Sequence, residues 1–202
     1  KPTNIIAVTG TNGKTSVAYF FYQILSLNKI PAASIGTLGI ISKKYNKKIN
    51  LTSMDPLSLH NNLQIFAKNK VKNVILEASS HGLEQKRLDN LNINTGIFTN
   101  LSHDHLDYHK NMQSYFNSKM YLFRNLLKKD SKIITDEDIK EYETIKKISN
   151  KRKIKKITIG TKTGEIKILN NKYKQSKQIV KISITSISIY KNWNICCIRH
   201  KF

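Results

Sequence analysis

The sequence predicts an α/β fold of the P-loop type, a doubly wound and mostly parallel sheet with helices on both faces. Short apolar runs typical of buried strands alternate along the chain with segments whose apolar residues have helical spacing. Each apolar run also ends in polar residues, and open parallel sheets bind ligands at the carboxyl ends of their strands. We therefore expect a single α/β domain with its binding site at that end of the sheet.

The first strand, loop and helix open the chain. Residues 4–9 (NIIAVT) form an apolar run that is followed by a glycine-containing loop, Gly10 to Gly13. From Lys14 onward, apolar residues recur at helical spacing. Because this strand lies so near the first residue, we expect the chain to begin at a domain boundary.

Further strands and helices are expected as far as about residue 164, and the pattern weakens after it. Residues 190–202 (YKNWNICCIRHKF) show no pattern. The domain is therefore expected over residues 1–170, and residues 171–202 are taken as a tail that is truncated or out of register from about Tyr173. The expected elements are a helix from Pro56 capped by Asp55, strands at residues 73–76 and 93–99, a helix at 112–127, a strand at 133–134, a helix at 136–148, a strand at 154–159, and candidate strands at 166–169 and 179–189.

The net charge of +22 would suggest nucleic acid as a partner, but the kind of cation argues against it. Lys and Arg total 35 against 13 Asp and Glu, and only four of the 35 are arginines. Arginine is the preferred reader of bases and the bidentate clamp for phosphates. Because Asn and Ile are abundant as well as Lys, a coding bias spread over solvated faces explains the charge. No nucleic-acid partner is expected.

Cysteine usage and hydropathy point to the cytoplasm. Cys196 and Cys197 are adjacent, so they provide neither a disulfide framework nor the CxxC spacing of a metal site. No apolar run approaches the roughly 18 to 20 residues that a spanning helix needs, and no signal peptide opens the chain. A cytoplasmic protein without a membrane partner is expected.

The segment GTNGKT, between the first strand and the first helix, is interpreted as a phosphate loop. Its glycines let backbone N–H groups point into an anion cavity, and the helix N-terminus adds a positive field. Lys14 would reach the β and γ phosphates, and the Thr15 hydroxyl can bind Mg²⁺. Val8 stands where the general pattern has glycine, so a plain glycine turn that starts a helix is the alternative. The expected ATP-binding residues of the loop are Gly10, Thr11, Asn12, Gly13, Lys14 and Thr15.

Together with this loop, several further motifs resemble the Mur ligase family, the enzymes that build the peptidoglycan peptide. The similarity is closest to the ligases that add the third residue, and it extends over roughly residues 5 to 128 in the family's order. TGTNGKT is the form of the phosphate loop found in this family and in folylpolyglutamate synthetases. EASSHGLEQKR at 77–87 resembles the family's E-V-S-S-H-G-L-x-Q-x-R, and TNLSHDHLDYH at 99–109 resembles its T-N-L-x-x-D-H-L-D-Y-H. TSMDP at 52–56 is a variant of T-T-P-D-P with Met54 in place of Pro. Asn117 to Lys119 match the position of a modified lysine.

The resemblance implies ATP and two Mg²⁺ ions as cofactors. Asn100 joins the phosphate loop as an ATP-binding residue, and Thr15 with Glu77 would hold the first metal. An unpaired carboxylate at the end of a buried strand is costly, so a metal explains Glu77 well. The alternative is that Glu77 acts only as a cap or as a hydrogen-bonded side chain.

The second Mg²⁺ is implied to bind His105 and a carbamate on Lys119. Lysine takes up CO₂ only as a neutral amine, which burial or metal proximity favours. Lys14, His105 and Lys119 are thus the implied catalytic residues. Two alternatives stay open, namely a lysine that snorkels toward water and a zinc cluster made by His103, His105 and His109.

The substrate implied by the resemblance is UDP-N-acetylmuramoyl-L-Ala-D-Glu, together with an incoming diamino acid. Arg87 suits a carboxylate or phosphate because its guanidinium is a planar fork, and a surface ion pair with Asp89 or Glu84 is the alternative. The implied substrate-binding residues are Thr52, Ser53, Ser79, Gln85 and Arg87.

The implied reaction is ATP-driven formation of an amide bond through an acyl phosphate. The family has three domains, and neither the N-terminal nor the C-terminal one is expected in these residues, so the chain alone is expected to bind nucleotide without full ligase activity. The complete enzyme is expected to be a monomer. A folylpolyglutamate synthetase and a noncatalytic nucleotide-binding remnant remain alternatives, whereas Ser79, Ser80 and His81 lack the glycines of a hydrolase nucleophile elbow.

Overall fold

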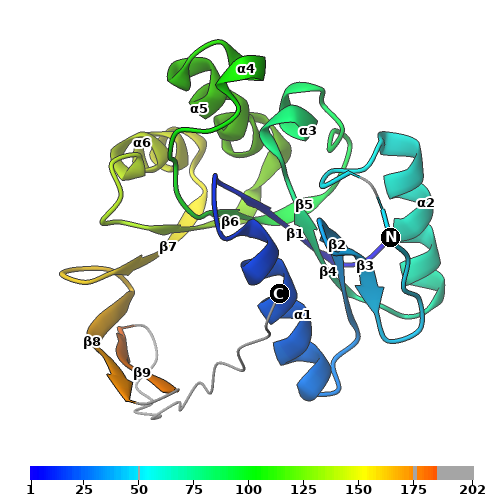
Figure 1. Cartoon of the computed structure of the whole chain (residues 1–202), viewed down its shortest axis with the longest axis horizontal. Helices are drawn as coiled ribbons and strands as arrows, with labels where there is room; N and C mark the ends of the chain where they lie inside the picture. The colour runs from blue at the N-terminus through cyan, green and yellow to red at the C-terminus, as the bar shows by residue number, and fades with distance from the viewer. Residues whose placement is uncertain (50, 175–176, 186–202) are drawn as a thin grey trace.

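The computed structural model describes residues 1–49, 51–174 and 177–185, and these form one mixed sheet with helices on both of its faces (Figure 1). The strand order is β3-β2-β4-β1-β5-β6-β7-β8-β9. Neighbouring strands are parallel except in two hairpins, β2–β3 and β8–β9, which lie at the two edges. This arrangement confirms the doubly wound, mostly parallel α/β fold.

The bounds of the elements follow the alternation of strands and helices that the sequence predicts. The strands are β1 Asn4–Thr9, β2 Ala32–Gly36, β3 Gly39–Ser42, β4 Asn73–Glu77, β5 Ile93–Phe98, β6 Leu127–Asp136, β7 Lys155–Gly160, β8 Ile166–Lys174 and β9 Lys177–Ile184. The helices are α1 Lys14–Leu27, α2 Pro56–Lys68, α3 Ser80–Glu84, α4 Leu106–His109, α5 Met112–Tyr121, the π-helix η1 Leu122–Leu126, and α6 Tyr142–Arg152.

Strand β1 occupies the centre of the sheet and places the phosphate loop. It pairs in parallel with β4 and β5, so that Val8 lies opposite both Glu77 and Ile97. The three carboxyl ends therefore meet at one place, where the chain continues into the loop after Thr9 and into the polar residues after Phe98. This is the binding position expected for an open parallel sheet.

Alternate residues of β1 pack into two separate cores. Ile5 and Ala7 belong to the larger cluster, to which α2, α3, α5 and α6 contribute. Ile6 and Val8 belong to a smaller cluster with Ala18 of α1, which is the only helix on the other face among the described residues (Figure 1). A strand buried on both faces reads as a continuous apolar run, as NIIAVT does.

Two helices show how the expected apolar faces are used. On α2, Asp55 caps the first turn by accepting from the Ser58 N–H at 2.9 Å, and the apolar residues Leu59, Leu63 and Phe66 are buried. On α1, by contrast, Phe20 and Ile24 are 47% and 59% exposed. Among the described residues, no helix combines the length and the apolarity needed to cross a membrane.

The helix predicted over residues 112–127 is correct only to Tyr121. Its last turn is the π-helix η1, and β6 begins at Leu127. A wider turn leaves carbonyl groups without their usual partners, and Arg152 from α6 donates to the carbonyls of Phe123 at 2.7 Å and Leu127 at 2.6 Å. The sequence pattern does not reveal this side chain as a distant cap.

The helix predicted from residue 136 begins six residues later, at Tyr142. Asp136 still pairs with Ile159 as part of β6. The Asp138 carboxylate then accepts from the N–H and hydroxyl of Thr161, at 2.7 and 2.8 Å, so the intervening residues form a loop fixed to the end of β7. Side-chain contacts of this kind compete with helix formation.

The end of the chain is ordered further than its pattern suggested. Strand β8 continues across residue 170, and β9 extends to Ile184, which confirms the candidate strand at 166–169 and the first part of that at 179–189. The rest of that strand and residues 190–202 lie outside the described residues. The hairpin β2–β3 was not predicted, although its two glycines bracket a two-residue turn.

Candidate nucleotide and metal site

A cavity of about 260 Å³ lies at the carboxyl ends of the central strands. Of the predicted residues, the loop from Thr11 to Thr15, Thr52, Glu77, Ser79 and His105 line it. Ser16 and Thr37 also line it and were not predicted. The sheet thus brings residues from four separate motifs to one cavity.

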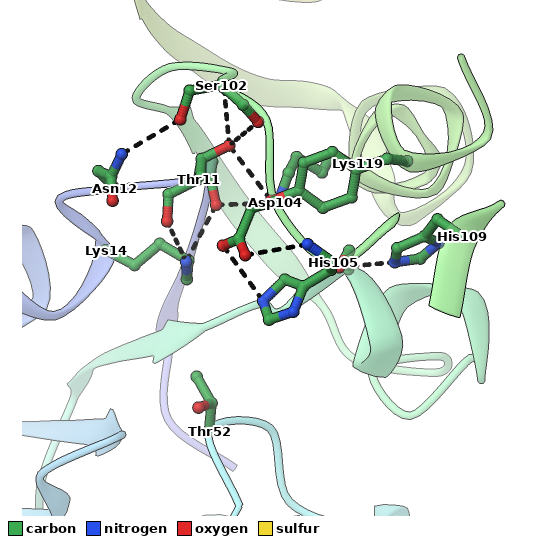
Figure 2. Close-up of polar contacts among 12 residues, drawn as sticks. Thr11, Asn12, Lys14, Thr52, Ser102, Asp104, His105, His109 and Lys119 are labelled. Atoms are coloured by element: carbon green, nitrogen blue, oxygen red, sulfur yellow. Dashed lines mark hydrogen bonds and ion pairs between the residues drawn. The ribbon is translucent and has the colours of Figure 1, made fainter. Parts of the chain in front are cut away.

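The phosphate loop curls around its own lysine. Lys14 Nζ donates to the carbonyls of Gly10 at 3.0 Å and Thr11 at 2.8 Å. Figure 2 shows the contact between Lys14 and Thr11. Burial lowers the pKa of Lys14, and the charges of Glu77 and Asp104 oppose that shift. Gly10 has a φ of 145°, and a Cβ there would overlap Thr99 Oγ1, so this position needs glycine.

Asn100, predicted to bind ATP, here braces the phosphate loop from the side of β5. Its Oδ1 accepts from the Asn12 N–H at 2.9 Å, and its carbonyl accepts from the Thr11 N–H at 2.9 Å. Ser102 adds a third contact by donating its N–H to Thr11 Oγ1 at 2.9 Å. Asn100 therefore acts on the shape of the loop and does not line the cavity.

Glu77 has the environment that a metal-binding carboxylate requires. It is 3% exposed and accepts hydrogen bonds from the Thr15 hydroxyl at 2.8 Å, the Thr37 N–H at 2.8 Å and the Thr37 hydroxyl at 3.2 Å. Within the described residues, no cation lies within ion-pair distance of this buried carboxylate. Glu77 is hydrogen-bonded, as the alternative without a metal also predicts, but its charge lacks a cationic partner among these residues. Hard oxygen ligands of this kind fit Mg²⁺.

Gly36 at the end of β2 is where this arrangement is most sensitive to a substitution. A Cβ on Gly36 would overlap the Glu77 side chain from Cγ to Oε1. Gly36→Ala is therefore expected to destabilise the fold by about 1–3 kcal/mol, as overpacking does. Chemical denaturation measures this.

The control is the same substitution in a Glu77→Ala background, which lacks the atoms that would clash. If Gly36→Ala costs as much free energy of unfolding there as in the natural sequence, the close approach to Glu77 is not the cause.

Lys119 is buried, so the snorkelling alternative is wrong. Its side chain is 1% exposed, and Nζ donates to the Gly10 carbonyl at 2.8 Å while lying 4.2 Å from the centroid of the Tyr115 ring. Desolvation lowers the pKa of Lys119 to about 7, the charge of Lys14 adds to the shift, and Asp104 opposes it. A substantial fraction of the amine is therefore neutral near pH 7, as carbamate formation requires.

His105 reaches the cavity from the start of α4. Its backbone has a φ of 52°, and Nε2 lies 3.4 Å from the Asp104 carboxylate, as Figure 2 shows. The zinc alternative finds no support, because the described residues contain no group of three or more His, Cys, Asp or Glu side chains placed to hold a metal. A second metal at His105 therefore depends on ligands of another kind, such as a carbamate or phosphate oxygens.

The predicted substrate-binding residues are linked beside the cavity. Ser53 Oγ lies 3.0 Å from Ser79 Oγ and donates to the Glu77 carbonyl at 2.9 Å. Arg87 donates from Nη1 to the Ser53 carbonyl at 2.7 Å and from Nε to Gln85 Oε1 at 2.8 Å. These contacts place the serines and the guanidinium in one hydrogen-bonded group.

The alternative partners of Arg87 are engaged elsewhere. Asp89 accepts from the Tyr121 hydroxyl at 3.1 and 3.0 Å, and Glu84 lies beside His109. Thr52, the remaining predicted substrate residue, has its Oγ1 3.2 Å from that of Thr37. Met54, which replaces the proline of the motif, is buried in the core.

The sequence reading missed several residues near this site. Thr37 follows Gly36 in the motif Gly-Thr-Leu-Gly, and reading that motif as a hairpin turn would have placed Thr37 at the end of β2. Tyr115, in the helix expected over residues 112–127, was given no role at the site, yet its hydroxyl lies 3.2 Å from Thr11 Oγ1. For Asp104, nothing beyond its place in the histidine motif pointed to the site.

Comparisons with known proteins give one consistent family. The sequence profile described as the Mur ligase middle domain matches residues 8–197. A relative from Rickettsia bellii, named UDP-N-acetylmuramoyl-L-alanyl-D-glutamate--2,6-diaminopimelate ligase, is 44% identical over 172 residues. The match covers 83% of this chain but 36% of that relative, so the chain spans little more than a third of its length.

Solved structures agree with this result. A structure described as UDP-N-acetylmuramoyl-L-alanyl-D-glutamate--2,6-diaminopimelate ligase superposes with a TM-score of 0.82 and 32% identity, covering 92% of this chain and 38% of the other. Folylpolyglutamate synthase from Mycobacterium tuberculosis, complexed with ADP and AMPPCP, has a TM-score of 0.64 and 15% identity, over 89% of this chain and 47% of that one. The second likeness shows the fold alone.

Proposed function

The chain belongs to the Mur ligase family, whose middle domain it contains, and from this premise we propose that it supplies the ATP and magnesium site of a ligase that extends UDP-N-acetylmuramoyl-L-Ala-D-Glu. The relatives' names support 2,6-diaminopimelate as the incoming residue in this proposal. The proposed reaction forms an amide bond in the cytoplasm. The other parts of the substrates would be bound by polypeptide outside these residues.

Each site residue has a role in this proposal. Lys14 exchanges its two loop carbonyls for the β and γ phosphates, and backbone N–H groups of the loop hold the remaining phosphate oxygens. Thr15 and Glu77 would hold the first Mg²⁺, and His105 with a carbamylated Lys119 would hold the second. Magnesium, when bound, neutralises the charge that develops on the transferred phosphoryl group.

The substrate side of the cavity orients the carboxylate that is to be activated. Ser53, Ser79 and Arg87 already form one hydrogen-bonded group next to Glu77, and Gln85 fixes the guanidinium. We propose that this group positions the substrate peptide so that its terminal carboxylate faces the γ-phosphate. The phosphoryl group passes to the carboxylate, the amine attacks the resulting acyl phosphate, and phosphate leaves; catalysis is mainly positioning and charge stabilisation.

The single observation that supports this proposal most directly is the buried carboxylate of Glu77, which accepts a hydrogen bond from the phosphate-loop Thr15 and has no ion-pair partner among the described residues. The first test is calorimetric titration of the chain with ATP, with and without Mg²⁺. Binding that Mg²⁺ strengthens is expected, and Glu77→Gln should remove that gain while leaving metal-free binding in place.

The second test concerns the substrate. Exchanging this chain for the matching segment of the Rickettsia bellii relative should give a protein that releases phosphate only when UDP-N-acetylmuramoyl-dipeptide and diaminopimelate are present. Phosphate release with a folate and glutamate instead would favour the folylpolyglutamate alternative. Nucleotide binding without turnover of either pair, in a chimera shown to be folded, would favour a noncatalytic remnant.

A further inference from the structure

His109 is a buried histidine that the proposed mechanism does not use. Its side chain is 0% exposed; Nε2 lies 2.9 Å from Ser80 Oγ, and Nδ1 lies 3.1 Å from Glu84 Oε2. Figure 2 shows His109 beside His105 and farther than His105 from the phosphate loop. Burial lowers the pKa of His109, and the charge of Glu84 opposes the shift. The hydrogen bond between the His109 ring and Ser80 connects α4 to α3, whereas Nδ1 lies near Glu84 without a hydrogen bond.

Helix α4 needs such a connection because it is a single turn. Its four residues are bracketed by His105 and Lys110, whose φ values of 52° and 65° are unfavourable for side-chain-bearing residues. The His109 N–H donates to the His105 carbonyl at 3.0 Å, which closes the turn. A helix of this length is not stable by itself, so its position depends on contacts from its side chains.

Those contacts reach α3 with the residues beside it and, through His109, Tyr115 of α5. Besides His109, Tyr108 packs its ring against His81 at 3.9 Å between centroids and accepts from Gln85 Nε2 at 3.2 Å. Only His109 enters the buried interface, where its ring also lies 5.1 Å from that of Tyr115. The loop that carries His105 is therefore fixed through the side chain four residues after it.

We infer that His109 is a positioning residue that sets the distance between His105 and Ser79. Ser80, its partner, is the first residue of α3 and directly follows Ser79, so one hydrogen bond couples the proposed second metal site to the proposed substrate site. This inference rests on the proposed function. It extends that function by assigning a role to a residue that touches neither metal nor substrate.

The order Ser80, His109 and Glu84 resembles the acyl-transfer triad of hydrolases, but the geometry does not allow that chemistry. Ser80 is 1% exposed and does not line the cavity. A nucleophile must reach a substrate carbonyl, and this hydroxyl faces a closed interface. The arrangement therefore serves to hold two elements together.

The test is manganese binding by the chain, followed by electron paramagnetic resonance in the presence of AMPPCP and bicarbonate. The natural chain is expected to bind two Mn²⁺ ions. His109→Leu should lower the affinity for the second ion by about 10- to 100-fold, the size of loss seen when a group that orients a metal ligand is removed. Affinity for AMPPCP in the absence of metal should not change, because the phosphate loop is untouched.

Three further variants separate positioning from general stability. His109→Gln can still donate to Ser80 Oγ and should restore most of the affinity for the second ion. Ser80→Ala should also lower the affinity for the second ion, and this variant replaces His109→Leu in the test if His109→Leu does not fold. The matched control is His60→Gln on α2, which should change nothing.

Two results would overturn the inference. One is unchanged binding of the second Mn²⁺ in His109→Leu, or in Ser80→Ala if His109→Leu does not fold. The other is that His109→Leu and His109→Gln both lower the affinity for metal, the metal-free affinity for nucleotide and the unfolding midpoint to a similar extent. That result would describe a purely structural histidine. A natural chain that binds no Mn²⁺ with AMPPCP would instead refute the proposed function, so the two failures are distinct.

Discussion

Replacement of Lys14 by alanine is expected to reduce the affinity of the chain for Mg·ATP by at least about tenfold, since hydrogen bonds to charged groups contribute roughly 1.5–3 kcal/mol each. The ammonium group is the one cation of the phosphate loop, and it now bonds the carbonyls of Gly10 and Thr11. Without it, those carbonyls face the γ-phosphate with no compensating charge. Isothermal titration calorimetry measures the loss directly.

A matched control is Lys68→Ala, which removes an exposed lysine from the last turn of α2. It should leave the ATP affinity unchanged, and this separates the effect of Lys14 from that of net charge. The assignment of the phosphate loop is wrong if both variants bind ATP as the natural chain does.

Replacement of Lys119 by alanine is expected to nearly abolish ligation in a full-length ligase that contains this domain, while the fold stays intact. If Lys119 carries a carbamate, the group that is lost is an acid, and it is lost from the second metal. Acetate should then restore part of the activity by occupying the vacated space, and alkylamines should not, because they bring the wrong charge to the metal.

The two additives distinguish the carbamate from a free amine. Phosphate release, measured with each additive over a range of concentrations, gives the rescue. Since the Lys119 Nζ bonds the Gly10 carbonyl in this structure, an amine that acts only by holding the loop would be replaced by alkylamines instead. Rescue by amines, or near-normal activity with no additive, would show that Lys119 does not act as a carbamate.

Motifs with local geometry could be predicted from the sequence, and contacts between distant residues could not. The strand, loop and helix of the phosphate site were correct because glycine spacing and helical periodicity both act over a few residues. Glu77 and His105 were found through motif resemblance, but their meeting with Thr15 follows from strand order, which no local pattern encodes.

The errors have a similar cause. The helix expected to end at residue 127 stops early because Arg152, from a later helix, satisfies its last carbonyls. The alternative in which Lys119 snorkels fails because its amine is buried against the Gly10 carbonyl and the Tyr115 ring. In both cases the contact that determines the outcome is made by a residue distant in the sequence, and local periodicity carries no information about such contacts.

The central position of β1 has a consequence for the order in which the molecule is made. Val8 pairs with Glu77 and with Ile97, so the cavity exists only after two long loops have closed around the first strand. Non-local parallel pairing is slow because loop-closure entropy is lost before the contacts form. We therefore expect nucleotide binding to develop late during refolding, after the edge hairpins have formed, and to be lost from any excised segment that lacks β1, β4 or β5.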